Sequence, residues 1–222
     1  MYNILGILNG KDVTNPLFHG LQQLEHDGYD SIRIATVMEG QIQSQQAEGL
    51  QSLLSKLPLQ GRFGIAYTRW TNQDEAPLHH IPFYATERVA IVHNGMIENY
   101  RELRHELIKL GYEFETQTDS EVLLRLISRY LDIGLSPTEA MSVTLMRLHG
   151  FFAIIALFAE EEGNLIAARR GHPLAIGLGE SALYVGSDIN TLTPLANQIL
   201  ELEEGCPAVL SSLKMNISKV CQ

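Results

Sequence analysis

The sequence predicts one α+β domain in which mainly antiparallel sheets are flanked by helices. The chain has 222 residues and 45% of them are hydrophobic, which is enough for a sizeable core in a single domain over residues 1–222. Strand-like segments at short spacing occupy both ends of the chain, and helical patterns fill about 100–148. Closely spaced consecutive strands favour antiparallel pairing, and helices on the outer faces bury the remaining apolar surface.

Short apolar runs define the expected strands. We expect them at Ile4–Leu8, Arg33–Met38, Phe63–Tyr67, Val89–His93, Phe151–Phe158, Asn164–Arg169, Leu174–Leu178, Ala182–Gly186, Ile199–Leu202 and Ala208–Ser211. The run Ile4–Leu8 lacks polar alternation and is therefore expected inside a sheet. The acidic run Glu160–Glu162, followed by Gly163, predicts a solvated hairpin turn.

Helices are indicated by apolar residues at helical spacing and by capping signals. One face gathers Leu17, Phe18, Leu21 and Leu24, and another gathers Leu103, Leu107 and Leu110 before Gly111. Two further helices are expected after Thr118-Asp119-Ser120-Glu121 and Ser136-Pro137-Thr138-Glu139. Both segments have the spacing of a capping box, and the second also has proline at the first helical position.

Composition excludes several classes of function. The formal net charge of -10 disfavours nucleic acid as a partner, and no apolar run reaches the length of a membrane span. The N-terminal segment does not resemble a signal peptide, and two cysteines, Cys206 and Cys221, form neither a disulfide framework nor a metal cluster. Adjacent His79 and His80 in an extended segment would point to opposite faces. We therefore expect a reduced cytoplasmic protein without a metal or other cofactor.

Two polar segments follow expected strands, and each has two interpretations. Arg69, next to Trp70, has the fork geometry to hold a ligand carboxylate, but a surface arginine beside a half-buried tryptophan explains the same letters. Asn94-Gly95 provides a side-chain amide and a backbone amide for an oxyanion, but Asn-Gly is also a favoured hairpin turn. From the residues alone the turn is the stronger reading.

A third polar segment is Thr118-Asp119, at an expected helix start. Asp119 is placed either to bind a ligand ammonium group or simply to cap the helix. One carboxylate does not separate these two interpretations, and capping is the more frequent case.

Taken in order, the segments are more specific than any one of them. LEHDGYDS, GIAYTRW, VHNGMIENYRELR, QTDSEV, AARRGHPLAIGLG and YVGSD closely resemble the glutaminase domain of the glutamine–fructose-6-phosphate aminotransferase family, from residue 1 to about 209. That domain is a class II glutamine amidotransferase of the N-terminal-nucleophile hydrolase type. The resemblance implies a four-layer αββα sandwich.

The resemblance also implies roles for individual residues. In the family, a cysteine exposed by removal of the initiator methionine attacks the glutamine side-chain amide, and its free amino group relays the proton. By resemblance, Asn94 and Gly95 stabilise the oxyanion, Arg69 with Trp70 holds the substrate carboxylate, and Asp119 holds its ammonium. The ammonia then passes to a sugar-binding isomerase half, which residues 1–222 do not include.

The position of the nucleophile departs from that pattern. The family begins Met-Cys-Gly, whereas this chain has Tyr2 and Asn3 after Met1. A phenol has a pKa of about 10 and is a poor acyl-transfer nucleophile at neutral pH. Because methionine removal requires a small second residue, we expect Met1 to stay and to block the amine.

Other positions around the expected pocket have changed as well. The family's RGYDSAG segment begins here with Asp27 and ends with Arg33, so a cation near the nucleophile has become an anion. The Thr-His pair that lines the family's glutamine pocket is Asn72-Gln73, and Ile81 replaces a histidine. Several changes around one pocket indicate loss of selection for glutamine hydrolysis.

Three hypotheses follow. The first is a degenerate glutaminase-like domain that binds glutamine or a related amino acid weakly and serves a partner such as an aminotransferase. The second is a working amidotransferase that supplies ammonia for glucosamine-6-phosphate synthesis with a separate isomerase-domain subunit. The third is a structural or regulatory domain that retains only the fold.

Overall fold

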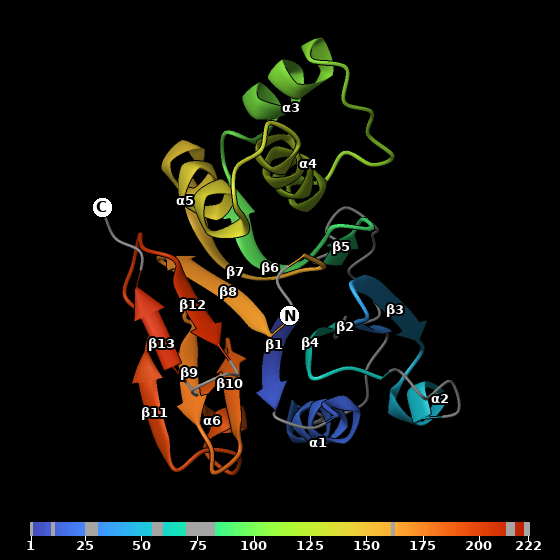
Figure 1. The fold of residues 1–222 in the computed structure, drawn as a ribbon, viewed down its shortest axis with the longest axis vertical. Coiled ribbons are helices and arrows are strands. Elements are labelled where there is room, and N and C mark those ends of the chain that lie inside the picture. Colours follow the sequence, from blue (N-terminus) through green and yellow to red (C-terminus); the bar gives the residue numbers. More distant parts are fainter. Residues whose placement is uncertain are drawn as a thin grey trace, which may run out of the picture.

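A computed structural model describes residues 2–9, 12–24, 31–54, 60–69, 83–160, 163–211 and 216–219 of the chain. Two antiparallel sheets face each other, and each is covered on its outer face by helices (Figure 1). The expected α+β fold, a four-layer αββα sandwich, is confirmed.

In the described part of the chain, the first sheet has seven strands in the order β11-β9-β10-β1-β4-β2-β3. Its central strand, β1, pairs antiparallel with β10 on one side and β4 on the other. The strands are β1 (Tyr2–Asn9), β2 (Ser31–Met38), β3 (Gln41–Ala47), β4 (Phe63–Arg69), β9 (Ala175–Leu178), β10 (Ala182–Gly186) and β11 (Gln198–Glu201).

The second sheet has six described strands in the order β13-β12-β8-β7-β6-β5. Its centre is the long pairing of β7 with β6 and β8. The strands are β5 (Phe83–Ala85), β6 (Val89–Ile97), β7 (Gly150–Phe158), β8 (Asn164–Arg170), β12 (Ala208–Ser211) and β13 (Asn216–Lys219).

Helices complete the outer layers. The first sheet packs on α1 (Thr14–Leu24), α2 (Leu50–Leu54) and α6 (Ile189–Leu192) through one apolar core. The second sheet packs on α3 (Tyr100–Lys109), α4 (Asp119–Asp132) and α5 (Pro137–Arg147) through another. A third core fills the space between the sheets. Alternate residues of each central strand therefore face different cores, as the period of two requires.

Most expected elements are confirmed, with ends that differ by a few residues. The structure adds β3, β5, β13, α2 and α6, which the sequence reading missed. Strand β3 reads QIQSQQA and lies at the sheet edge, where a polar strand is satisfied by one partner and water. Glu39 and Gly40, both with positive φ, form the tight turn between β2 and β3. Gly40 was therefore the one sequence signal that could have indicated a hairpin here.

The helix caps and the hairpin that the sequence predicts are found in the structure. Ser136 and Glu139 form a reciprocal capping box at the start of α5, and Thr118 accepts from the Glu121 backbone N–H at the start of α4. The hairpin expected after β7 is confirmed by the antiparallel pairing of β7 with β8, although residues 161–162 lie outside the described residues.

Two further findings concern the excluded classes. None of the described helices is long and apolar enough to cross a membrane. Cys206 is disulfide-bonded, so the expectation of a reduced thiol is wrong at this position.

The sandwich depends on close contact between the sheets, and Ile155 of β7 tests this. Ile155 is fully buried, and a Cβ on Gly6 of β1 would lie 3.0 Å from its Cγ2 atom. We expect Ile155→Ala to lower the free energy of unfolding by about 2–5 kcal/mol, because the cavity cannot close against a sheet. Denaturant unfolding measures this loss. Met146→Ala, at a side chain 73% exposed, is the control, and an equal loss there would contradict the assignment.

Candidate functional site

The alternation along β6 gives the two faces of the candidate site. Ala90 and Val92 belong to the core between the sheets, whereas Val89 and Ile91 belong to the core under the helices. Continuing that alternation, His93 faces the helices and Asn94 faces the space between the sheets. Cα atoms of both β1 and β4 lie within 8 Å of Cα atoms in β6 across that space. Asn94 is therefore on the face of β6 that is directed toward β1.

Two buried hydrogen bonds join this end of β6 to the start of α4. The Ile97 backbone N–H donates to Asp119 Oδ2 at 2.9 Å, and His93 Nδ1 lies 2.9 Å from Ser120 Oγ. All three polar side chains, His93, Asp119 and Ser120, are at most 3% exposed. The residues on either side of Asn94-Gly95 are thus tied to a helix N-terminus, and Asp119 is fixed beside the strand.

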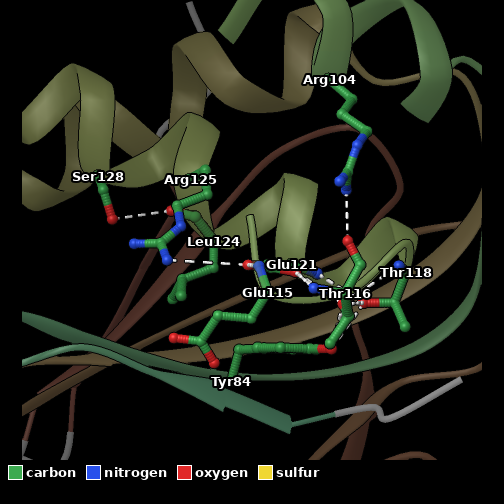
Figure 2. A network of polar contacts seen from close by, with 9 residues as sticks. All are labelled: Tyr84, Arg104, Glu115, Thr116, Thr118, Glu121, Leu124, Arg125 and Ser128. Atoms are coloured by element: carbon green, nitrogen blue, oxygen red, sulfur yellow. Dashed lines mark hydrogen bonds and ion pairs between the residues drawn. The ribbon is translucent and has the colours of Figure 1, made fainter. Parts of the chain in front are cut away.

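The helix start is itself held by a buried carboxylate (Figure 2). Glu121, 1% exposed, accepts from the backbone N–H groups of Glu115 at 2.8 Å and Thr116 at 2.7 Å. It also accepts from the Thr116 hydroxyl at 2.6 Å, and Thr118 donates to the Tyr84 hydroxyl at 2.8 Å. These bonds satisfy a buried charge and fix the loop that precedes Asp119.

The hairpin-turn interpretation of Asn94-Gly95 is wrong. Strand β6 continues to Ile97, with Asn94 opposite Ala153 and Gly95 opposite Phe152 of β7. Gly95 has a φ of 106°, and a Cβ there would lie 2.1 Å from the Phe151 carbonyl oxygen. Glycine is therefore required by backbone conformation and by contact, inside a strand rather than at its end.

The capping interpretation of the Thr118-Asp119 segment is confirmed for Thr118 but does not hold for Asp119. The N-cap residue of α4 is Thr118, whose side chain accepts from the Glu121 N–H at 3.2 Å. Asp119 is the first helical residue and its Oδ2 atom accepts from another element, β6. Its carboxylate is consequently part of the contact between the strand that carries Asn94 and the helix layer.

Backbone pairing brings together the other positions implied by the resemblance. Tyr2, the first residue of β1, lies opposite Arg69, the last residue of β4. On the other side of β4, Ser31 of β2 also lies opposite Arg69. Position 2 and position 69 are therefore neighbours at one end of the first sheet.

Several residues singled out from the sequence lie outside the described residues. They are Met1, Asp27, Trp70, Asn72, Gln73, His79, His80 and Ile81. Of Tyr2 and Arg69 the structure describes the backbone pairing only. Among the described residues, no group of three or more His, Cys, Asp or Glu is arranged to hold a metal ion.

The structure adds polar residues near the same sheet end that the sequence reading missed. Ser31 Oγ lies 3.4 Å from the Tyr67 hydroxyl, and Gln46 Nε2 donates to Ser31 Oγ at 3.5 Å. Arg33 Nε donates to Gln46 Oε1 at 2.7 Å, and its guanidinium lies 5.7 Å from the centre of the Phe83 ring. Period-two alternation in β2 was the one sequence signal that could have placed Ser31 and Arg33 on a common face.

His172 is a second addition, from the loop after β8. Its Cδ2 atom would lie 3.0 Å from a Cβ on Gly95, so the imidazole packs on the Gly95 backbone. Burial lowers the pKa of His172 below its ordinary value, which favours the neutral ring. A neutral imidazole beside Gly95 adds no charge to the candidate oxyanion position.

The comparisons with known proteins agree with this arrangement. Residues 68–194 match the model of a glutamine amidotransferase domain family. The chain belongs to this glutamine amidotransferase family. It is 46% identical over 224 residues to the isomerizing glutamine–fructose-6-phosphate aminotransferase of Bartonella henselae, which covers 99% of this chain and 37% of that protein. The equivalent enzyme of Rhizobium meliloti is 41% identical over 221 residues and covers 98% and 36%. The chain thus spans little more than a third of the length of these relatives.

Solved structures support the fold of this glutamine amidotransferase domain. An allosteric regulatory enzyme of purine biosynthesis has a TM-score of 0.81 at 21% identity, over 98% of this chain and 48% of that one. The glutamine phosphoribosylpyrophosphate amidotransferase of B. subtilis has a TM-score of 0.78 at 22% identity, over 98% and 49%. These likenesses support the four-layer sandwich described above.

Gly95 gives a test of the site geometry. Gly95→Ala is expected to lower the free energy of unfolding by at least about 4 kcal/mol, because overlap with the Phe151 carbonyl adds to the cost of a positive φ. Gly111→Ala is the matched control, since Gly111 has a φ of 91° but nothing within 4 Å of an added Cβ. It should cost only about 1–2 kcal/mol. Equal losses in denaturant unfolding would show that the contact is absent.

Proposed function

We propose that this glutamine amidotransferase domain binds the α-amino-acid end of glutamine, or of a related amino acid, without hydrolysing the side-chain amide. The observation that carries the proposal is the contrast between two positions. Asp119 is anchored by a buried hydrogen bond to Ile97, three residues after Asn94 in β6, whereas the residue paired with Arg69 at the start of β1 is Tyr2. Asp119 suits the binding of a ligand, whereas Tyr2 does not supply the thiol that hydrolysis would need.

Tyrosine at position 2 is the argument against turnover. The family nucleophile is a cysteine at this position, and a phenol is almost entirely protonated at neutral pH. A tyrosine oxygen also lies several ångströms farther from the backbone than a cysteine sulfur, so donors placed for a thiolate would miss the oxyanion.

The retained groups support binding of a zwitterion. Asp119 offers carboxylate acceptors to an α-ammonium group, and Arg69 offers a fork to an α-carboxylate. The residues that changed in the resemblance, Asn72, Gln73 and Ile81, belong to the part that served the amide. Charge-assisted hydrogen bonds contribute about 1.5–3 kcal/mol each, and desolvation with lost ligand freedom cancels much of this. The expected dissociation constant is on the order of 0.1–1 mM.

The first test is hydrolysis. The unaltered protein is expected to release no ammonia from glutamine above background, and Tyr2→Cys should restore little activity. The new thiol would be opposed by the charge of Asp27, which raises a thiol pKa, and the Asn72-Gln73 segment would hold the amide poorly. Ammonia release is measured directly, with intact mass to confirm that Met1 is removed from the variant. Substantial release by the unaltered protein would instead favour a working amidotransferase that supplies a separate isomerase-domain subunit.

The second test is binding, measured by isothermal titration with glutamine and glutamate. Arg69→Ala is expected to abolish the heat, because it removes the carboxylate fork. Asn94→Ala is the matched control within the same site and should bind nearly as well, since an oxyanion donor acts in the transition state rather than the ground state. No heat at millimolar ligand, or equal binding by Arg69→Ala, would mean that the domain is kept for its fold or for a protein partner.

A further inference from the structure

An arginine of the first sheet lies between the two sheets, next to the candidate amino-acid site. Arg33 is two residues along β2 from Ser31, whose backbone is paired with Arg69. Its guanidinium lies 5.7 Å from the centre of the Phe83 ring in β5, and Phe83 is paired with β6 two residues before Asn94. Arg33 therefore links the two sheets at a level two strand residues deeper in the sandwich than the site.

The Arg33 guanidinium keeps donors that a ligand can reach. Its Nε atom donates to Gln46 Oε1 at 2.7 Å, and this bond is open to water. In the described part of the chain, Nη1 and Nη2 of Arg33 make no hydrogen bond or ion pair, and neither atom is buried. The described arginines that form ion pairs with carboxylates are Arg88, Arg125, Arg147 and Arg169. Arg33 thus brings a positive charge that no described carboxylate neutralises.

The neighbours of Arg33 hold its guanidinium in one orientation. The Phe83 ring that it contacts is buried and lies 6.2 Å from the buried ring of Tyr67. Gln46, which accepts the Nε bond, donates in turn to Ser31 Oγ at 3.5 Å. Because a guanidinium is planar, the ring contact and the Nε bond together fix the direction of the two Nη groups. A pre-organised fork loses little freedom when it binds an anion.

From this geometry we propose that Arg33 makes the site selective for glutamate over glutamine, by binding the side-chain carboxylate. The inference rests on the proposed function, in which Arg69 and Asp119 hold the α-amino-acid end. Arg33 and Arg69 are diagonal neighbours on adjacent strands, and such positions are about 7–8 Å apart, so one dicarboxylate can span them. A carboxylate accepts two parallel hydrogen bonds from a guanidinium, whereas an amide offers one oxygen and turns an NH2 donor toward the cation.

The test is isothermal titration of the full chain with L-glutamate and, separately, with L-glutamine, at constant ionic strength set by sodium chloride. Glutamate is expected to bind about tenfold more tightly than glutamine. Arg33→Gln should weaken glutamate binding about tenfold and leave glutamine binding unchanged, and Arg33→Lys, which keeps the charge but loses the fork, should fall between. Arg62→Gln, at an exposed arginine before the opposite end of β4 from Arg69, is the matched control and should bind both ligands like the unaltered protein.

The possible outcomes separate this inference from the proposed function. Equal binding of glutamate and glutamine by the unaltered protein overturns the role of Arg33 and leaves amino-acid binding standing. An equal loss of glutamate binding in Arg33→Gln and Arg62→Gln also overturns it, because that result is a general charge effect. Absence of saturable heat with both ligands overturns both proposals. Circular dichroism and thermal melts verify that Arg33→Gln is folded, and Arg33→Lys supplies the comparison if it is not.

Discussion

The hydrogen bond from the Ile97 backbone N–H to Asp119 Oδ2 is the constraint on which the candidate site depends. It joins the end of β6 to the first residue of α4, and the buried contact between His93 and Ser120 makes a second connection directly before Asn94-Gly95. A buried carboxylate without such a partner would be costly, so the fold and the site need the same bond. The Glu121 bonds to Glu115 and Thr116 then hold the loop that delivers Asp119.

A residue that the fold itself requires gives an ambiguous prediction of function from the sequence. The sequence leaves Asp119 open as a helix cap or as a group that binds a ligand ammonium, and in the structure its carboxylate accepts a hydrogen bond from β6 and so joins that strand to the helix layer. Asn94-Gly95 was read as a turn because Asn-Gly favours tight hairpins. The strand continues because Gly95 adopts a positive φ and packs against the backbone of β7, a tertiary demand that local propensity does not contain.

The fold was largely predictable, since the apolar strands and capped helices carry clear periodicity and the order of the motifs carries the family. The elements and contacts that were missed lack a clear local pattern in the sequence. Strand β3 is polar because an edge strand is covered on one side only, and β5 is three residues long. The chain of contacts from Arg33 through Gln46 to Ser31 depends on the register of β2 against β3, which no single segment reveals.

The fold constrains the residues of the candidate site unequally, and this decides which of them carry information about chemistry. Gly95 and Asp119 are required by packing and by a buried hydrogen bond, so their presence follows from the fold whether or not glutamine is hydrolysed. Position 2 differs, because the pairing of β1 with β4 uses only its backbone, and a strand accepts tyrosine at least as readily as cysteine. Nothing in that pairing selects the side chain. Position 2 is therefore where a requirement for a particular chemistry would be visible, and ammonia release tests the proposal that glutamine is bound without turnover.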